Sequence, residues 1–319
     1  MPARSSDLRE AAEAALACLG VGPHDSVLVL CNRAQRTVAA ALAGAAEHRA
    51  ETVRVLEYAD ATRHGQEPPD SVRDAMRKAT VIFAATSFSI SHTQARLDAT
   101  ARGARIATLP AISEELFRRG LPVDYAELKR TGERIAAALT TAATCRVTSP
   151  SGTDLVLTLK GRRAIVDDGN LYTPGAFGNL PAGEVYIAPI EARAEGSIVF
   201  DGSLAGYGLL PEPLHITVAE GRVTAATGRA AGWLLETLDA GGPGGRQIAE
   251  LGIGTNPLAK LSGNTLEDEK VAGTAHLAFG TNASFGGHTV STVHIDGILL
   301  HPTLALDTHL ILRDGSLVV

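Results

Sequence analysis

Residues 250–296 read ELGIGTNPLAKLSGNTLEDEKVAGTAHLAFGTNASFGGHTVSTVHID and concentrate side chains that can bind a metal ion. These side chains are Glu250, Glu267, Asp268, Glu269, His276, His288, His294 and Asp296. Seven glycines lie among them. Because glycine allows tight turns and close approach of backbones, short segments of this stretch can converge on one point. The stretch therefore predicts a compact site around which the rest of the chain is organised.

Two of the histidines lie in segments with the alternation of a β-strand, TAHLAF around His276 and STVHID around His294. Residues two apart on a strand share a face, so we expect His294 and Asp296 to point the same way. An imidazole and a carboxylate on one face can bind Zn, Mn, Fe or Co. A single strand histidine is more often an ordinary hydrogen-bonded residue. The prediction therefore rests on the convergence of several ligands.

The N-terminal part of the chain alternates short apolar segments with helical patterns. Strands are expected at DSVLVLCN, ETVRVLEY, TVIFAAT and ARIATLP, and helices at QRTVAAALAGAAEH, DSVRDAMRK and SHTQARLDATARG. This order predicts a doubly wound parallel sheet. No G-x-G-x-x-G follows the first strand, so no dinucleotide site is expected. Ser91 and His92 follow the third strand, where such sheets bind ligands, although capping of the next helix explains Ser91 better.

A helical stretch over residues 124–140 leads out of this first region, and the sequence then changes character. Segments such as CRVTSPSGTDLVLTLKGRRAIVDDG and PLHITVAEGRVTAATG alternate apolar and polar residues between glycine-containing turns, which predicts antiparallel hairpins. The 319 residues exceed what one core usually serves. We therefore expect two domains: an α/β domain with a doubly wound sheet over residues 1–142, and a strand-rich α+β metal-binding domain over residues 143–319.

The composition narrows the class of protein. A content of 45% hydrophobic and 20% charged residues is that of an ordinary globular protein, and a net charge of -6 argues against a nucleic-acid partner. Charged residues interrupt the apolar pattern of the first 20 residues, which predicts an amphipathic helix rather than a signal peptide or membrane span. The three cysteines, Cys18, Cys31 and Cys145, are widely spaced. They are typical of a cytoplasmic protein without a cysteine metal site.

The second domain resembles the M29 family of metallo-aminopeptidases, including its short "leucyl aminopeptidase"-like members. The resemblance rests on SPSGTDL, NLPAGEVYIAP, AELGIGTNP, GNTLEDEK, AHLAFGTN and VHID. It implies two divalent metal ions, Zn, Mn or Co, held by two glutamates, two histidines and an aspartate. Matched motif by motif, these ligands are Glu184, Glu250, His276, His294 and Asp296, with Glu184 and Glu250 also as catalytic residues. The resemblance further implies a homodimer and a small-molecule or short peptide substrate.

Two features separate the chain from the longer members of that family. Their proposed catalytic tyrosine falls here on or near Ala283. The chain is also similar in fold to the 2,5-dihydroxypyridine 5,6-dioxygenases, which hold one Fe(II) with two histidines and an aspartate. That branch lacks the glutamate at the position of Glu184 and has a histidine at that of Glu250. Five ligands with three carboxylates favour a dinuclear hydrolytic site over a mononuclear iron site.

The sequence thus predicts a metallohydrolase in which two ions activate water for attack on an amide or related carbonyl. One of Glu267, Asp268 and Glu269 is a candidate general acid or base, although a solvated helix start explains the run slightly better. His288 is left outside the ligand set. The alternatives are a mononuclear Fe(II) ring-cleaving dioxygenase that acts on a hydroxylated N-heterocycle, and a non-catalytic metal-binding relative.

Overall fold

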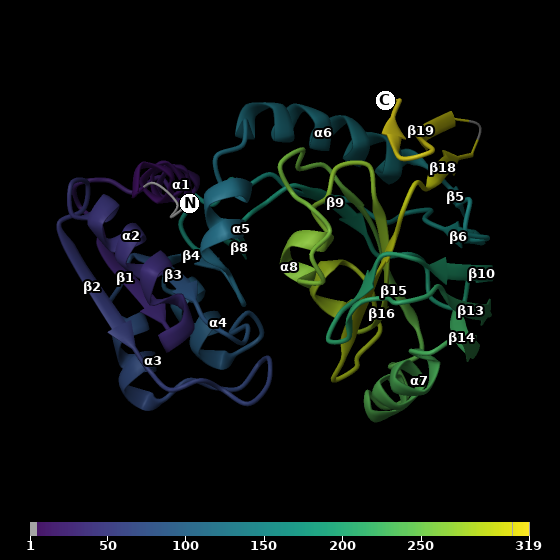
Figure 1. Ribbon diagram of the computed structural model, residues 1–319, viewed down its shortest axis with the longest axis horizontal. Coiled ribbons are helices and arrows are strands. Elements are labelled where there is room, and N and C mark those ends of the chain that lie inside the picture. Colours follow the sequence, from purple (N-terminus) through teal and green to yellow (C-terminus); the bar gives the residue numbers. More distant parts are fainter. Residues whose placement is uncertain (1–4, 308, 319) are drawn as a thin grey trace. The chain divides into compact units, whose positions relative to one another are not determined.

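The computed structural model describes residues 5–307 and 309–318, and the chain forms two compact units (Figure 1). Unit 1 comprises Met1–Asp124 and Gly169–Ala182, and unit 2 comprises Tyr125–Asp168 and Gly183–Val319. The units thus part at residue 124, and unit 1 includes a later segment of the chain. The division into folding domains over residues 1–142 and 143–319 stays a prediction.

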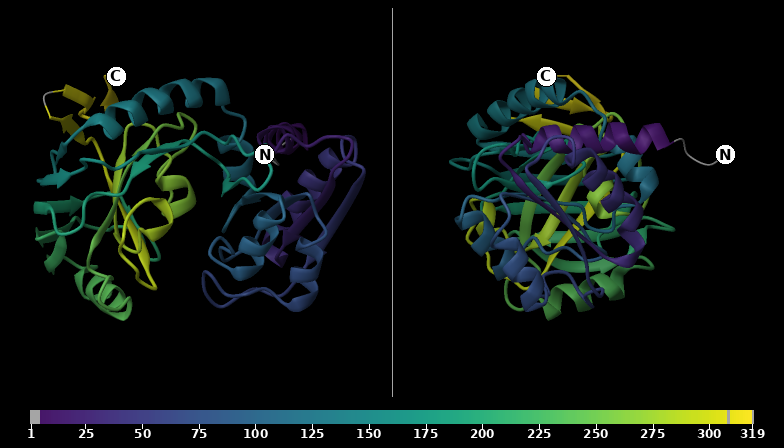
Figure 2. Two further views of the ribbon diagram at one scale, coloured as in Figure 1. Left: turned by 180° about the vertical axis from the view of Figure 1, so that it is seen from behind. Right: turned by 90° about the vertical axis from the view of Figure 1, so that its left-hand side faces the viewer.

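Unit 1 is built on a five-stranded sheet in the order β2-β1-β3-β4-β8, in which every neighbouring pair is parallel. Its elements are α1 (Ser5–Cys18), β1 (Ser26–Cys31), η1 (Arg33–Gln35), α2 (Arg36–Ala46), β2 (Thr52–Glu57), α3 (Asp70–Met76), β3 (Val81–Ala85), α4 (Gln94–Ala101), β4 (Arg105–Thr108), α5 (Glu114–Gly120) and β8 (Phe177–Asn179). The central strand β3 is buried throughout, whereas the edge strand β2 is largely exposed. Helices flank the sheet (Figure 2). The predicted doubly wound α/β fold is confirmed.

Two details of unit 1 differ from the sequence prediction. The fifth strand, β8, is a three-residue segment far along the chain that pairs with β4 through Ile106 and Phe177, and so short a segment carries no periodic signal. The N-cap of α4 is Thr93, whose hydroxyl accepts from the backbone N–H of Arg96 at 3.2 Å. The hydroxyl of Ser91 instead bonds those of Ser89 and Thr108. The capping role of Ser91 was therefore wrong.

Unit 2 contains two antiparallel sheets and two longer helices. Its elements are α6 (Tyr125–Thr141), β5 (Thr144–Thr148), β6 (Asp154–Thr158), β7 (Ile165–Asp167), β9 (Glu184–Ile187), β10 (Ala194–Phe200), β11 (Ser203–Leu204), β12 (Gly208–Leu209), β13 (Leu214–Ala219), β14 (Arg222–Thr227), α7 (Ala231–Ala240), β15 (Ile248–Gly254), α8 (Thr265–Asp268), β16 (Ala275–Gly280), η2 (Ala283–Phe285), β17 (His294–Leu299), β18 (Thr303–Leu306), β19 (His309–Arg313) and β20 (Ser316–Leu317). One sheet has the order β14-β13-β10-β6-β5-β18-β19-β20, and the other β12-β11-β17-β16-β15-β9-β7. The predicted strand-rich region is confirmed.

The two sheets of unit 2 share one hydrophobic core. Leu155 and Leu157 of the eight-stranded sheet belong to the same buried cluster as Leu251 and Leu277 of the seven-stranded sheet. Side chains on each strand alternate between the two faces of their sheet. The apolar residues of β15 and β16 therefore fill the core, and the residues between them line the opposite face of the seven-stranded sheet, where the candidate site lies.

Helix α6 packs on this second unit rather than leading out of the first. Its residues Ile135 and Leu139 are fully buried in the core of unit 2. At Gly132 the helix comes so close to β7 that a Cβ atom would lie 2.4 Å from Cγ1 of Val166. Glycine at this position therefore permits the close packing of the helix on the sheet.

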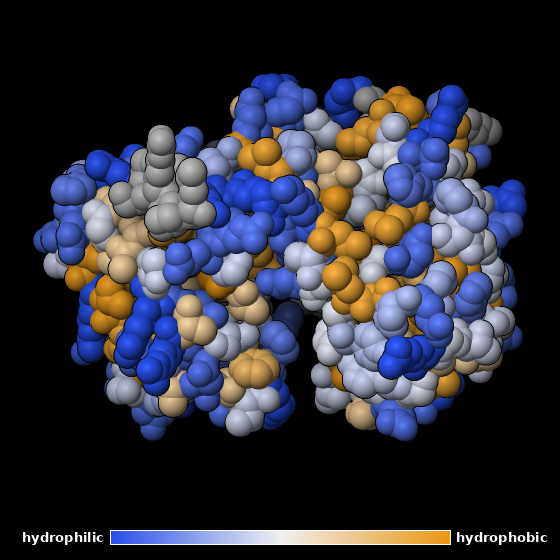
Figure 3. All heavy atoms as spheres, in the orientation of Figure 1, coloured by the Kyte–Doolittle hydropathy of each residue, from blue (hydrophilic) through white to orange (hydrophobic). Residues whose placement is uncertain are grey.

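The surface is that of a chain with mixed polarity. In Figure 3, hydrophobic residues lie among hydrophilic ones on the visible face of each unit. Among the described residues, no helix combines the length and hydrophobicity that a membrane crossing requires.

Candidate metal centre

Four adjacent strands of the seven-stranded sheet, β9, β15, β16 and β17, carry the five predicted ligands. The strand register aligns them: Gly254 pairs with Glu184, Gly252 with His276, and Ala278 lies between Glu250 and Asp296. Paired residues on neighbouring strands point to the same face of a sheet. The register thus brings residues 184, 250, 276, 294 and 296 to one face, although they are distant in sequence.

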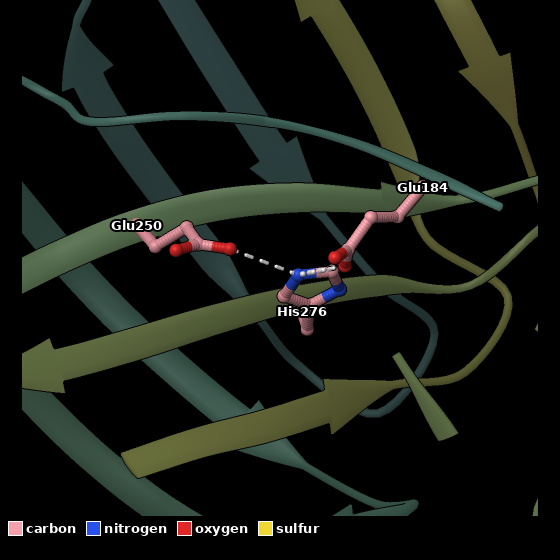
Figure 4. A group of neighbouring side chains, drawn as sticks. All are labelled: Glu184, Glu250 and His276. Carbon is pink, nitrogen blue, oxygen red and sulfur yellow. Dashed lines mark hydrogen bonds and ion pairs between the residues drawn. The ribbon is translucent and has the colours of Figure 1, made fainter. Parts of the chain in front are cut away.

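The first group consists of Glu184, Glu250 and His276, all of them buried. Nε2 of His276 lies 3.3 Å from Oε2 of Glu184 and 3.3 Å from Oε1 of Glu250. Figure 4 shows the imidazole between the two carboxylates, with one ring nitrogen facing both of them. One imidazole nitrogen and two carboxylate oxygens thus converge on a common point.

The second group consists of Glu250, His294 and Asp296. Nε2 of His294 lies 3.3 Å from Oδ1 of Asp296 and 3.5 Å from Oε2 of Glu250. The other ring nitrogen, Nδ1, lies 2.8 Å from the carbonyl oxygen of Thr281. Donation from Nδ1 to this carbonyl leaves the lone pair of Nε2 for a ligand. Glu250 belongs to both groups and offers a different oxygen to each.

Gly252 makes room for the first group. A Cβ atom at this position would lie 1.9 Å from Nε2 of His276. The imidazole therefore lies directly over the backbone of β15, in a place that any side chain would fill. The G-x-G pattern after Glu250, at Gly252 and Gly254, thus has a steric cause that the sequence alone did not reveal.

A divalent ion fits this set of donors. The buried Oε2 of Glu184 has no hydrogen-bond partner in the part of the chain that the structure describes, and an unpaired buried oxygen is unusual unless it holds an ion or water. Each group offers two carboxylates and one imidazole, donors that suit Zn, Mn, Fe and Co. The metal-ligand role of the five residues stays a prediction.

The buried ligand residues strongly shift one another's pKa values. Burial lowers the pKa of His294, but Asp296 and Glu250 raise it more, to about 10. Burial raises the pKa of Asp296, but His294 lowers it more, to about 2. Burial holds the pKa of Glu250 above its ordinary value despite the hydrogen bond with His276. Such mutually perturbed buried groups are typical of functional sites, and this face attracts cations.

Lys270 and Asp167 extend the cluster, and neither was singled out in the sequence. Nζ of Lys270 lies 2.6 Å from Oε1 of Glu184, 3.0 Å from Oε2 of Glu269 and 3.8 Å from Oδ2 of Asp167. The lysine side chain is fully buried. A lysine between two ligand segments was a visible signal, but a charged residue after three acidic ones is normally taken for a solvated surface.

The acidic run at residues 267–269 lies at the end of α8, where Glu267 and Asp268 are buried and Glu269 is partly buried rather than solvated. Oε1 of Glu267 accepts from the backbone N–H of Lys260, and the carboxylate of Asp268 accepts from Ser203, Ser262 and Gly263. Both therefore hold loops in place. Glu269 differs, because the effect of burial on its pKa is increased by the charges of Asp296 and Glu184. Burial raises the pKa of Glu269 to about 8, so this residue remains the candidate acid or base.

The loop between β16 and β17 is fixed at its base. Asn282 is fully buried and accepts from the backbone N–H of Thr289 at 2.8 Å, and Glu191 accepts from the backbone N–H of His288 at 2.7 Å. The side chain of His288 is exposed and lies in neither ligand group. Ala283, at the position of the M29 tyrosine, is also exposed and brings no hydroxyl to the site.

Two aromatic side chains stand beside the second group. The ring of Phe285 meets His294 edge-on at 5.9 Å between centroids, and Tyr186 meets Phe285 at 5.5 Å. Tyr186 shares a face of β9 with Glu184. Burial, followed by the charges of Glu184 and Glu250, raises the pKa of the Tyr186 phenol. The phenol therefore stays protonated and can donate a hydrogen bond beside the ligands.

Residues 7–319 match the model of a family described as NicX, 2,5-dihydroxypyridine 5,6-dioxygenase. The chain belongs to this family. The 2,5-dihydroxypyridine dioxygenase from Pseudomonas putida KT2440 has the same fold, with a TM-score of 0.84 and 21% identity over 100% of this chain and 99% of that one. AmpT from Thermus thermophilus gives a TM-score of 0.75 and 20% identity over 99% and 100%. No curated protein sequence matches the chain.

Family membership changes the balance between the predicted functions. The fold relationship to M29 enzymes is supported, because AmpT is an M29 aminopeptidase, but membership of that branch is not. The family name of the dioxygenases supports the ring-cleaving alternative better than the hydrolase prediction. The relative from Pseudomonas putida is an enzyme by name, and at such low identity the likeness to both solved structures shows the fold alone.

Proposed function

We propose that the chain is a metal-dependent hydrolase that acts on a small substrate and holds two divalent ions. The observation that carries this proposal is the pair of ligand groups that share Glu250. Fold and family leave the reaction open, because related folds host different chemistries. The donor set bears on the reaction directly, since ligand type and number select the metal and its open positions.

Charge supports two ions over one. Glu184, Glu250 and Asp296 supply three carboxylates within the two groups. One divalent ion would leave a buried negative charge without compensation, which is costly in a protein interior. Two divalent ions leave one positive charge, which a hydroxide balances. Lys270 does not change this count, because Asp167 balances its charge and Glu269, whose pKa is raised to about 8, holds a proton near neutral pH.

The residues of the chain divide the work in this proposal. Glu184 and Glu250 hold the imidazole of His276 between them. The carbonyl of Thr281 fixes the tautomer of His294 through Nδ1. Two bound ions would lower the pKa of water toward neutrality and polarise a carbonyl. Glu269, whose pKa is raised to about 8, is the candidate to carry a proton. Tyr186 and Phe285 offer one hydroxyl and an aromatic edge to a small substrate.

Ring cleavage by a mononuclear Fe(II) site is the second candidate, and family membership favours it. The group formed by Glu250, His294 and Asp296 provides three ligands to a single ion. It has one histidine where the dioxygenases described above have two. The second candidate therefore requires that a glutamate replace an iron-binding histidine without loss of the reaction.

Metal analysis and reconstitution separate the candidates. Protein purified without chelator should contain about two transition-metal ions per chain. Apoprotein should regain hydrolysis of an aminoacyl amide from a substrate panel when Zn(II), Mn(II) or Co(II) is added under argon. Restoration by Fe(II) alone, with oxygen consumed during turnover of a hydroxylated N-heterocycle, would establish the second candidate instead. A protein that binds no ion would be the non-catalytic relative.

We also propose that the protein is a homodimer, from the M29 resemblance and from the frequency of symmetric dimers among oligomers. Light scattering at micromolar concentration should give twice the chain mass of 33.1 kDa. A monomer mass under these conditions would refute the proposal.

A further inference from the structure

Lys270 is a buried charge that the proposed reaction does not use. It follows α8 and its side chain is fully buried, in contact with three carboxylates from different parts of unit 2. Burying an ammonium group is costly unless its charge is compensated. Carboxylates on three sides compensate this cost, so the side chain is a cation within the acidic cluster.

We propose that Lys270 acts as an internal cation that makes the Glu184 group the weaker of the two metal sites, so that ions bind first at the Asp296 group. This inference rests on the two-ion site proposed above, but not on hydrolysis as the reaction. It concerns the order and strength of metal binding, and it holds for any chemistry that the loaded site performs.

The first reason is the number of free donor atoms. Oε1 of Glu184 is taken by Nζ of Lys270 at 2.6 Å, so only Oε2 faces His276. An ion in the Glu184 group therefore finds one oxygen of this carboxylate rather than two. In the other group, neither oxygen of Asp296 or Glu250 is paired with lysine among the described residues.

The second reason is repulsion between like charges. Lys270 contacts Glu184 directly, whereas its ion-pair partners among the described residues include no member of the Asp296 group. An ion bound by Glu184 would lie one carboxylate away from the ammonium. Coulomb energy falls with distance and is large in a buried site. The ammonium thus weakens binding in the Glu184 group more than in the Asp296 group.

Co(II) titration of full-length apoprotein tests the inference, because the visible absorption of bound Co(II) reports occupancy without any substrate. The wild-type protein should bind in two steps. Lys270→Met should tighten the second step by about tenfold or more, since it removes the repulsion and frees Oε1 of Glu184. Lys260→Met is the matched control, because it removes an exposed positive charge and should leave both steps unchanged. An unchanged or weakened second step in Lys270→Met would overturn the inference.

Ligand variants that keep Lys270 give an independent measurement should Lys270→Met not fold. His276→Ala should abolish the weak step and retain the tight one, and Asp296→Asn should do the reverse. Loss of the tight step in His276→Ala would overturn the inference. A wild-type protein that binds no Co(II) at all would overturn the two-ion site itself, so the two failures are distinguishable.

Discussion

A buried polar residue of unit 1, Asn32, and the ligand face of unit 2 differ in how their polar atoms are paired. At the carboxyl ends of β1 and β3 in unit 1, Asn32 is buried and fully engaged: its Nδ2 donates to the carbonyl of Tyr58, and its Oδ1 accepts from the backbone N–H of Ser87. On the ligand face of unit 2, carboxylates lie close to one another, and Oε2 of Glu184 lacks a hydrogen-bond partner within the described chain. The amide of Asn32 finds its hydrogen-bond partners within the protein, whereas the carboxylates of the ligand face are compensated only when a cation is added.

This difference distinguishes buried polar residues that stabilise the fold from buried polar residues that can bind an ion. A neutral network of paired donors and acceptors stabilises the fold without a ligand. A cluster with excess charge of one sign is costly on its own, and it persists where a bound ion compensates it. Substitutions in unit 2 should therefore change metal content first, and substitutions in unit 1 should change stability first.

The largest expected effect is that of Glu250→Ala, because Glu250 belongs to both ligand groups. Both ions should be lost and activity should fall by several orders of magnitude, while the circular dichroism spectrum stays that of a folded protein. Elemental analysis measures the metal content. His294→Ala, which alters one group, should lose less metal than Glu250→Ala. Metal retained at wild-type stoichiometry in both variants would disprove the ligand assignment.

Gly252→Ala should have the next largest effect. The new Cβ atom would lie 1.9 Å from Nε2 of His276, so the imidazole must move away from Glu184 and Glu250. We expect loss of about one ion per chain, with a stability cost of about 1–3 kcal/mol from overpacking. Gly44→Ala is the control, because no atom lies within 4 Å of its Cβ position. Equal metal content in both variants would contradict the steric account.

Asn32→Ala should have the smallest effect on the site and should act on unit 1 alone. The substitution leaves the carbonyl of Tyr58 and the N–H of Ser87 without their partner. Chemical denaturation should show a loss of about 1–3 kcal/mol in the free energy of unfolding. Metal content should remain that of the wild type. A loss of metal from this variant would break the proposed contrast between the two units.

Much of the fold followed from sequence patterns that repeat. The strands β1, β3 and β4 and the helices α2 and α6 were predicted because their periodicity extends over several residues. Helices α5 and α7 were missed because their short patterns lie between stronger turn signals. Strand β8 was missed because its partner is distant in the chain, and pairing of this kind leaves no local trace.

The residues of the candidate site were predicted from the sequence, but most of their arrangement was not. His294 and Asp296 were expected on one face because residues two apart on a strand share a face. In the structure, Nε2 of His294 lies 3.3 Å from Oδ1 of Asp296. The other three predicted ligands were matched through family motifs, and only the strand register shows how they meet. The position of Lys270 between two ligand segments was visible, but its burial was not, because it depends on Glu184, which lies 86 residues earlier in the chain.

The return of residues 169–182 to unit 1 has a consequence for how the protein is made. During synthesis the parallel sheet stays one strand short until β8 has left the ribosome, by which time β5, β6 and β7 have already been translated. A gene fragment that stops at residue 124 would encode an incomplete sheet, and one that starts at residue 125 would carry β8 without its partner β4. The two units are therefore interleaved in the gene, and neither can be obtained by a single cut.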